Sequence, residues 1–252
     1  MTLKPYHARL SGWGRCPVVD GLLLKSENLA AGGETASLAR GLGRSYGDSS
    51  LPADADRPVL DTTLADRLLS FDPASGTLRA EAGASLFMLN RVFLRRGWFV
   101  PVSPGTQFVT LGGMVASDVH GKNHHVDGCF GEHVISLKLR TGDGRIVECS
   151  DRCEPELFRA TIGGMGLTGH VLEVEFPMRK IPSPWIWSES ERIENLDRMV
   201  SGLKEAARDW PMTVGWVDCL ARGEKLGRGI LMKGRWATPN QAPGKPPVVK
   251  RR

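Results

Sequence analysis

Alternating hydrophobic and polar positions predict several strands in the chain. Residues 77–82 alternate Leu and Ala with Thr, Arg and Glu, the period-two pattern of a half-buried strand. The turn-forming residues 73–76 precede this segment, so we expect it to pair with a strand at 68–71 in a hairpin. Further strands are expected at 59–60, 135–140, 145–149, 172–176 and 214–220.

Helical spacing is clearest just after the first hairpin. Ser85 can cap a helix whose apolar stripe runs from Leu86 to Leu94, and Gly97 suits its C-terminal end. Residues 154–161 and 193–210 also have helical patterns. Strands and helices interleave, and several strands pair through short turns. The pattern therefore predicts an α+β fold.

The positions of the prolines predict a domain boundary, and the length and composition limit the class of protein. The 252 residues suffice for one large or two modest domains. Prolines between residues 177 and 184 break the strand pattern and predict a boundary near residue 180. No apolar run reaches the length of a membrane helix, and the N-terminus leads into no signal core, so we expect a cytoplasmic protein. The five scattered cysteines are interpreted as free thiols.

The positive charge favours anionic ligands. The formal net charge is +5, and basic residues are concentrated only at 250–252. Dinucleotide phosphates, a lipid phosphate or an anionic membrane surface would each fit this charge. No nucleic-acid motif accompanies it, so we predict no nucleic-acid partner.

Three glycine-rich segments are candidate anion sites, at 41–48, 104–113 and 163–169. Backbone N–H groups can approach an anion at glycine because no side chain intervenes. The third segment contains the Gly-x-Gly-x-x-Gly spacing, but an expected helix precedes it and a strand follows. That order is the reverse of a nicotinamide-dinucleotide turn. Structural turns explain each segment alone, whereas one phosphate-bearing cofactor explains all three.

Residues 117–125 hold three of the six histidines beside Lys122. His120 and His124 are four residues apart, but Gly121 interrupts any helix and no Glu lies between them, so we predict no metal site. Loop histidines and a polar face along a cofactor ring remain alternatives. A cation about 4 Å from a reduced flavin would stabilise its negative charge by ~4 kcal/mol at an effective dielectric of 20.

Four segments together resemble the PCMH-type FAD-binding domain of the vanillyl-alcohol-oxidase superfamily. They are 39–48, 110–113, 118–125 and 166–169, and the His-Gly-Lys-Asn-His-His string is the most specific. The resemblance extends from about Ser11 to near the C-terminus. It is closest to the oxidases of polyprenylphosphoryl ribose, and the sugar-lactone oxidases are more distant.

This resemblance implies a two-lobed α+β FAD-binding domain at 1–180, followed at 181–252 by the beginning of an antiparallel-sheet substrate domain. It implies the following FAD-binding residues: Ala39, Arg40, Gly41, Leu42, Gly43, Arg44, Ser45, Tyr46, Gly47, Asp48, Ser49, Gly105, Thr110, Leu111, Gly112, Gly113, Ser117, Asp118, Val119, His120 and Val171. Lys122, His120 and Tyr46 are implied as catalytic residues facing the flavin ring. Relatives that bind FAD covalently carry a histidine in the first glycine loop. This loop has none, so we expect non-covalent FAD.

The activity implied is oxidation of a secondary alcohol of a sugar, or of a polyprenyl-phosphate sugar, by hydride transfer to flavin. The alternatives are a sugar-lactone or alditol oxidase and a flavin-binding module without turnover. The resemblance also implies a short-chain reductase as partner enzyme and peripheral contact with a membrane. Relatives continue beyond residue 252, so we expect much of the substrate pocket, including the catalytic base, to lie outside this chain.

Overall fold

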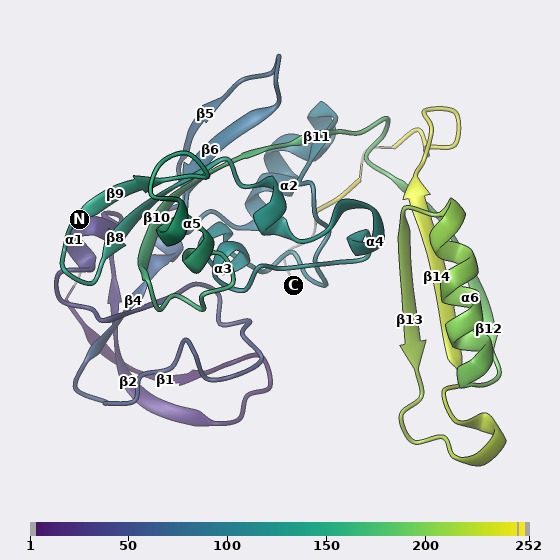
Figure 1. Ribbon diagram of the computed structural model, residues 1–252, viewed down its shortest axis with the longest axis horizontal. Helices are drawn as coiled ribbons and strands as arrows, with labels where there is room; N and C mark the ends of the chain where they lie inside the picture. Colours follow the sequence, from purple (N-terminus) through teal and green to yellow (C-terminus); the bar gives the residue numbers. More distant parts are fainter. Residues whose placement is uncertain (1–3, 246, 250–252) are drawn as a thin grey trace.

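The computed structural model describes residues 4–245 and 247–249, so the basic cluster at 250–252 lies outside the described residues. Helices and several mainly antiparallel sheets confirm the predicted α+β fold (Figure 1). A larger body carries residues up to Lys180, and a separate sheet with one long helix lies to its side. Among the described helices, none is long and apolar enough to cross a membrane.

A four-stranded sheet at one end of the body has the order β1-β2-β4-β3. Its strands are β1 (Tyr6–Ser11), β2 (Val18–Lys25), β3 (Leu38–Arg40) and β4 (Pro58–Asp61). β1 and β2 are antiparallel, whereas β4 runs parallel to both β2 and β3. Val59 and Leu60 on β4 are fully buried.

The central sheet is five-stranded and antiparallel, with the order β5-β6-β10-β8-β9. Its strands are β5 (Leu68–Phe71), β6 (Thr77–Glu81), β8 (Ser136–Thr141), β9 (Ile146–Cys149) and β10 (Gly169–Pro177). The expected hairpin is confirmed as β5 and β6. Leu78, Leu137, Val174 and Phe176 share the face of this sheet that is fully buried.

Short helices cover this buried face and join the main core. They are α1 (Leu29–Gly32), α2 (Leu86–Phe93), α3 (Leu111–Ala116) and α5 (Pro155–Thr161), with a short strand β7 (Trp98–Phe99) after α2. The short helix α4 (His124–Asp127) has no buried residue and contributes none to this core. The Ser85 hydroxyl accepts from the Met88 N–H, as predicted, and a 3-10 turn then ends at left-handed Gly97. Met114 and Val115 of α3 are fully buried in the core.

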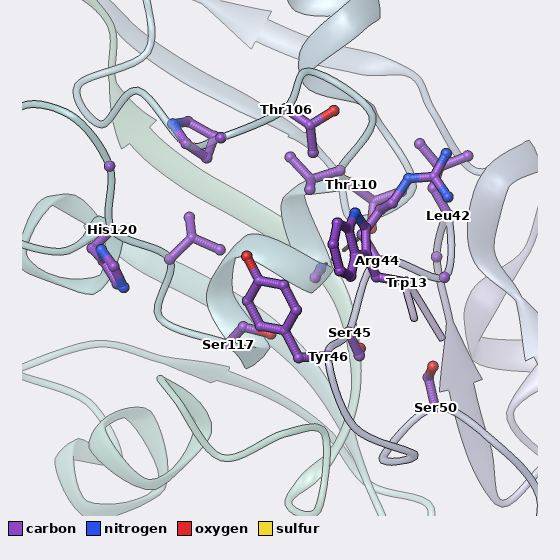
Figure 2. Close-up of a pocket in the computed structure, with 18 of the residues that line it drawn as sticks. Trp13, Leu42, Arg44, Ser45, Tyr46, Ser50, Thr106, Thr110, Ser117 and His120 are labelled. Atoms are coloured by element: carbon purple, nitrogen blue, oxygen red, sulfur yellow. Dashed lines mark hydrogen bonds between the residues drawn. The ribbon is translucent and has the colours of Figure 1, made fainter. Parts of the chain in front are cut away.

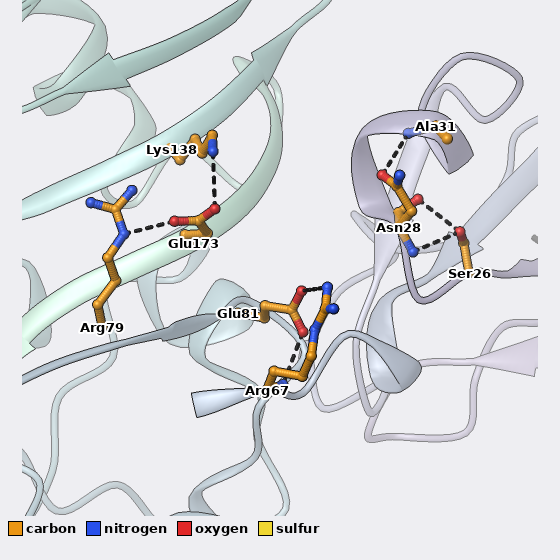
Figure 3. Close-up of polar contacts among 8 residues, drawn as sticks. All are labelled: Ser26, Asn28, Ala31, Arg67, Arg79, Glu81, Lys138 and Glu173. Carbon is orange, nitrogen blue, oxygen red and sulfur yellow. Dashed lines mark hydrogen bonds and ion pairs between the residues drawn. The ribbon is translucent and has the colours of Figure 1, made fainter. Parts of the chain in front are cut away.

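The opposite face of the central sheet is polar (Figure 3). Arg79 donates to Glu173 at 2.7 Å, and Lys138 donates to the same carboxylate at 3.1 Å. Arg79 also pairs with Glu148 on the outer strand β9. The two pairs with Glu173 join neighbouring strands and the Arg79–Glu148 pair spans from β6 to β9, so they favour one register of the sheet while the apolar side chains remain on the other face.

The C-terminal part forms a three-stranded antiparallel sheet, ordered β12-β14-β13, with one helix packed on it. Its elements are β12 (Ile186–Ile193), α6 (Leu196–Asp209), β13 (Met212–Val217) and β14 (Gly229–Trp236). The helical pattern begins later than expected because Ile193 ends β12 and Asn195 caps α6. Pro177 ends β10, the short β11 (Arg179–Lys180) pairs with β7, and the chain then enters β12.

Specific contacts hold the C-terminal sheet against the body. The Thr213 N–H donates to the Lys122 carbonyl at 2.9 Å, and the His125 ring lies 2.8 Å from the Trp210 carbonyl oxygen. The Phe99 and Trp236 rings meet edge to face at 5.1 Å. These contacts place the beginning of β13 beside residues 120–125.

Candidate functional site

A cavity of about 840 Å³ opens between the loops of the body and the beginning of β13. The following residues line it: Trp13, Gly41, Leu42, Gly43, Arg44, Ser45, Tyr46, Gly47, Asp48, Ser49, Ser50, Pro104, Gly105, Thr106, Val109, Thr110, Gly113, Ser117, Val119, His120, Gly121, Lys122, Met165, Thr213 and Val214. Figure 2 shows Tyr46 in the middle of this site, between Trp13 and His120. The cavity is within the size range of sites for small molecules and cofactors, roughly 300–1,000 Å³.

The loop that follows β3 forms one wall, and its backbone has little internal hydrogen bonding. No backbone N–H from Leu42 to Ser50 donates to another residue in the part of the chain that the structure describes. Most of this loop lines the cavity. N–H groups without a protein partner are available to an anion or to water, so the loop can bind a phosphate-bearing ligand.

An aromatic pair stands over this loop. The Trp13 and Tyr46 rings meet edge to face, with their centroids 5.6 Å apart, and they are 61% and 86% exposed. Large aromatic rings left this exposed at a cavity are suited to contact a flat ligand. We did not predict Trp13 as a site residue, although the Gly and Pro residues around it are typical of a turn.

The second glycine segment supports the first. The Thr110 hydroxyl accepts from the Gly113 N–H at 3.2 Å and thereby caps α3. Gly41 lies against the Thr110 side chain so closely that an added Cβ would overlap its hydroxyl oxygen. Gly105 has open space where a side chain would stand. This packing brings the two segments to the same cavity.

The His-Gly-Lys string forms the opposite wall through another close approach. A Cβ on Gly121 would overlap the Ser103 carbonyl oxygen, so only glycine fits there. The Lys122 N–H donates to that same carbonyl at 3.2 Å, and the Lys122 ammonium donates to the Pro104 carbonyl at 3.4 Å. The His120 ring meets the His124 ring edge to face at 5.5 Å. Lys122 is thus a cation at the wall of the cavity.

A buried asparagine fixes this wall from behind. Asn123 is 2% exposed. Its side chain accepts from the Ser103 N–H at 3.0 Å and donates to both the Pro101 carbonyl and the Asp127 carboxylate at 2.7 Å. Asp127 in turn forms a two-pronged ion pair with Arg179. We did not predict this network, because its partners are remote in sequence.

The structure brings most of the predicted site residues to one cavity. They are Gly41, Leu42, Gly43, Arg44, Ser45, Tyr46, Gly47, Asp48, Ser49, Gly105, Thr110, Gly113, Ser117, Val119, His120 and Lys122. The third glycine segment, 163–169, contributes only Met165. Two of the three segments therefore meet as expected, and the third closes the cavity at its margin by a side chain.

Other predicted residues do not line the cavity: Ala39, Arg40, Leu111, Gly112, Asp118 and Val171. Leu111 and Val171 belong to the hydrophobic core. A Cβ on Gly112 would lie 3.0 Å from the Ala82 Cβ, so this glycine serves the packing of α3 on the end of β6. The Gly112 N–H donates to the Ala82 carbonyl at 2.8 Å, so FAD binding by Gly112 stays a prediction that this packing does not support.

Three further predicted residues that do not line the cavity lie at the flanks of the loops. Ala39 pairs with Leu60 inside the four-stranded sheet. Asp118 has a positive φ of 38°, and its carboxylate accepts from the Gly131 N–H at 2.7 Å. Arg40 lies beneath its loop, where it bonds to protein groups.

The cavity fits FAD in its chemistry. The Leu42–Ser50 loop offers free N–H groups at one wall, and Lys122 offers a positive charge at the other. In the described part of the chain, no group of three or more His, Cys, Asp or Glu side chains is placed to hold a metal ion. The donor set is thus suited to an organic anion.

Comparison with known proteins agrees with this chemistry. Residues 28–150 match the family described as FAD binding domain. The chain is 34% identical over 249 residues to decaprenylphosphoryl-beta-D-ribose oxidase of Mycolicibacterium smegmatis, covering 94% of this chain and 54% of that protein. L-gulonolactone oxidase of Bos taurus is 29% identical over 149 residues, covering 56% and 32%.

D-arabinono-1,4-lactone oxidase of Candida albicans is 28% identical over 116 residues, covering 46% of this chain and 20% of that protein. The chain spans about half the length of the ribose oxidase and a smaller share of the lactone oxidases.

Replacing Asn123 tests the support behind the Lys122 wall. Asn123→Ala leaves the Ser103 N–H and the Pro101 carbonyl without their side-chain partner. A buried polar group left unpaired costs about 1–3 kcal/mol, so we expect a loss of that order in the free energy of unfolding, measured by urea denaturation. His124→Ala, at an exposed neighbouring position, is the control. Equal stability of the two variants would contradict the role of Asn123.

The Asp127 ion pair predicts a pH dependence of stability. Burial by itself would raise the pKa of Asp127, but hydrogen bonds from Arg179 and Asn123 outweigh it and hold the pKa below its ordinary value. The stabilisation is therefore complete above about pH 4, the ordinary pKa of an aspartate, and is lost as the pH falls through the lower pKa of the folded state.

Urea denaturation at several pH values checks this dependence. Arg179→Met should lose less stability than the wild type on acidification, because the variant has less to lose. Arg198→Met, which removes the Arg198 pairs with Glu191 on β12 and Glu205 on α6, should follow the wild-type pH curve. An unchanged pH curve in Arg179→Met would show that the pair does not depress the pKa.

Proposed function

We propose that the protein, whose residues 28–150 match the family described as FAD binding domain, is an FAD-dependent oxidoreductase that oxidises a secondary alcohol of a sugar. One observation carries the proposal: a loop with free backbone N–H groups and a lysine on the His-Gly-Lys string face the same cavity. FAD needs both, because it carries a diphosphate at its centre and a ring that gains negative charge on reduction.

The Leu42–Ser50 loop would hold the diphosphate. Its N–H groups have no described protein partner, and Arg44 at the same wall is exposed and lines the cavity. Gly47 has open space where a side chain would stand. Backbone donors at glycine positions and a nearby guanidinium are a usual combination for phosphate oxygens. No histidine lies in this loop, which supports non-covalent binding.

The His120–Lys122 wall would hold the flavin ring. Bound FAD would be the acceptor of a hydride from the substrate carbon. Lys122 stabilises negative charge at the ring edge and can orient a substrate hydroxyl. His120 shapes the ring face, and the exposed Tyr46 ring lies across the cavity from His120. Thr213 and Val214 close the wall from the C-terminal sheet, so substrate access depends on that sheet.

The choice of a sugar with a secondary hydroxyl as the substrate is based on the relatives. The one that this chain matches over 94% of its own length is named as a ribose oxidase. The alternative, oxidation of a sugar lactone, rests on relatives that match 46–56% of the chain. We therefore favour a sugar ring with a free secondary hydroxyl, with a polyprenyl-phosphate carrier as one form of it. A short-chain reductase partner and peripheral membrane contact would accompany that form.

Purification and turnover test the proposal. The protein should be yellow, and heat denaturation should release free FAD into the supernatant, identified by its fluorescence. Sugars with a free secondary hydroxyl should then bleach the bound flavin anaerobically. A folded but colourless protein that takes up no FAD would refute the proposal, and flavin that stays with the denatured chain would refute non-covalent binding. FAD binding without bleaching would leave a flavin-binding module without turnover.

Removing the Lys122 charge tests the ring end of the site. In Lys122→Met the backbone contacts to Ser103 and Thr213 remain, so FAD should still bind. Loss of a cation about 4 Å away corresponds to ~4 kcal/mol at an effective dielectric of 20. The midpoint potential of the two-electron flavin couple should therefore fall by tens of millivolts. Potentiometric titration measures this potential, with Lys204→Met on the exposed side of α6 as the control. Equal potentials in the two variants would place the charge away from the ring.

A further inference from the structure

The turn after β1 packs closely against the Leu42–Ser50 loop, called the cofactor loop below. A Cβ on Gly12 would lie 2.7 Å from the Ser45 carbonyl oxygen and 2.8 Å from that of Gly47. The next residue, Trp13, donates its N–H to the same Ser45 carbonyl at 2.9 Å. These carbonyls therefore face the turn, and the shape of the loop depends on residues that precede the matched segment 28–150.

Arg40 binds the loop from the same side. Its guanidinium donates to the Ser11 carbonyl at 2.6 Å and to the Ser50 hydroxyl at 3.1 Å. The left-handed Gly43, with φ of 65°, passes so near this guanidinium that a Cβ would overlap it. Arg40 thus joins the end of β1 to the far end of the loop.

The charge of Arg40 is not neutralised by direct contact. Within the described residues, no carboxylate lies at ion-pair distance from its guanidinium. Asp61, its partner in register on β4, accepts from the Thr63 N–H at 3.0 Å and lies 3.6 Å from the Lys25 ammonium. A cation beneath a loop with free N–H groups adds to the attraction of an anion bound on the other side.

We infer that Ser11, Gly12, Arg40 and Ser50 form a clasp that sets the shape and the charge of the diphosphate-binding loop. Arg40 is a positioning residue, since it acts through the loop and does not line the cavity. This inference rests on the proposed function. It adds that residues before position 28 help to determine the affinity for the cofactor.

A pair of glycine substitutions tests the shape of the loop. Gly12→Ala should raise the dissociation constant for FAD at least tenfold, because its methyl group would push the Ser45 and Gly47 carbonyls outward. Gly14→Ala is the matched control, because no atom lies within 4 Å of its added Cβ, and it should bind FAD as the wild type does. Titration of the apoprotein measures both constants, and circular dichroism checks that the variants fold.

Wild-type affinity in Gly12→Ala, or equal weakening in both variants, would overturn the inference. Absence of FAD binding by the wild type would instead refute the proposed function, so the two failures are distinguishable.

Arg40 variants test the charge. Arg40→Gln should weaken FAD binding about tenfold or more and flatten the dependence of affinity on salt concentration, because one screened attraction is lost. Arg40→Lys keeps the charge and should keep the salt dependence, while its affinity falls because one ammonium cannot span Ser11 and Ser50. A merely structural role would weaken both variants alike and leave the salt dependence unchanged. That result, or a wild-type affinity independent of salt, would overturn the role of the charge.

Discussion

The cavity exists because loops approach one another more closely than any side chain would allow. Gly121 meets the Ser103 carbonyl, Gly41 meets the Thr110 side chain, and Gly12 meets the carbonyls of the cofactor loop. Each contact joins segments that are separate in the chain. If one of these approaches opened, the walls of the cavity would move apart, and the free N–H groups and the lysine would no longer face a common space.

Some polar groups around the cavity bond to other protein groups, whereas others are left for a ligand. Asn123 satisfies the backbone of 101–103 from behind, and Thr110 caps α3. The Leu42–Ser50 loop keeps its N–H groups free of described protein partners. Buried polar groups are costly when unpaired, so a loop of this kind is stable only where solvent or a ligand reaches it. The Lys122 carbonyl also accepts from the Thr213 N–H and so links the His120–Lys122 wall to the C-terminal sheet.

This arrangement relates the matched segment to the rest of the chain. Residues 28–150 carry most of the cavity, but Trp13 reaches it from the N-terminal side and Val214 from the C-terminal side. The cavity therefore includes residues outside the family match at both ends. Thr213 and Val214 at the beginning of β13 join the C-terminal sheet to this cavity.

The sequence by itself determined the local features: the β5–β6 hairpin, the helix capped by Ser85, and the two glycine segments and histidine string of the cavity. These follow from periodicity, turn chemistry and glycine spacing, which act over a few residues. Only the tertiary structure decided the direction of each side chain. It turned Arg40 and Gly112 toward the protein and brought Trp13 and Thr213 to the cavity. That direction depends on partners distant in sequence, such as Ser11 for Arg40 and Ala82 for Gly112, which no local pattern contains.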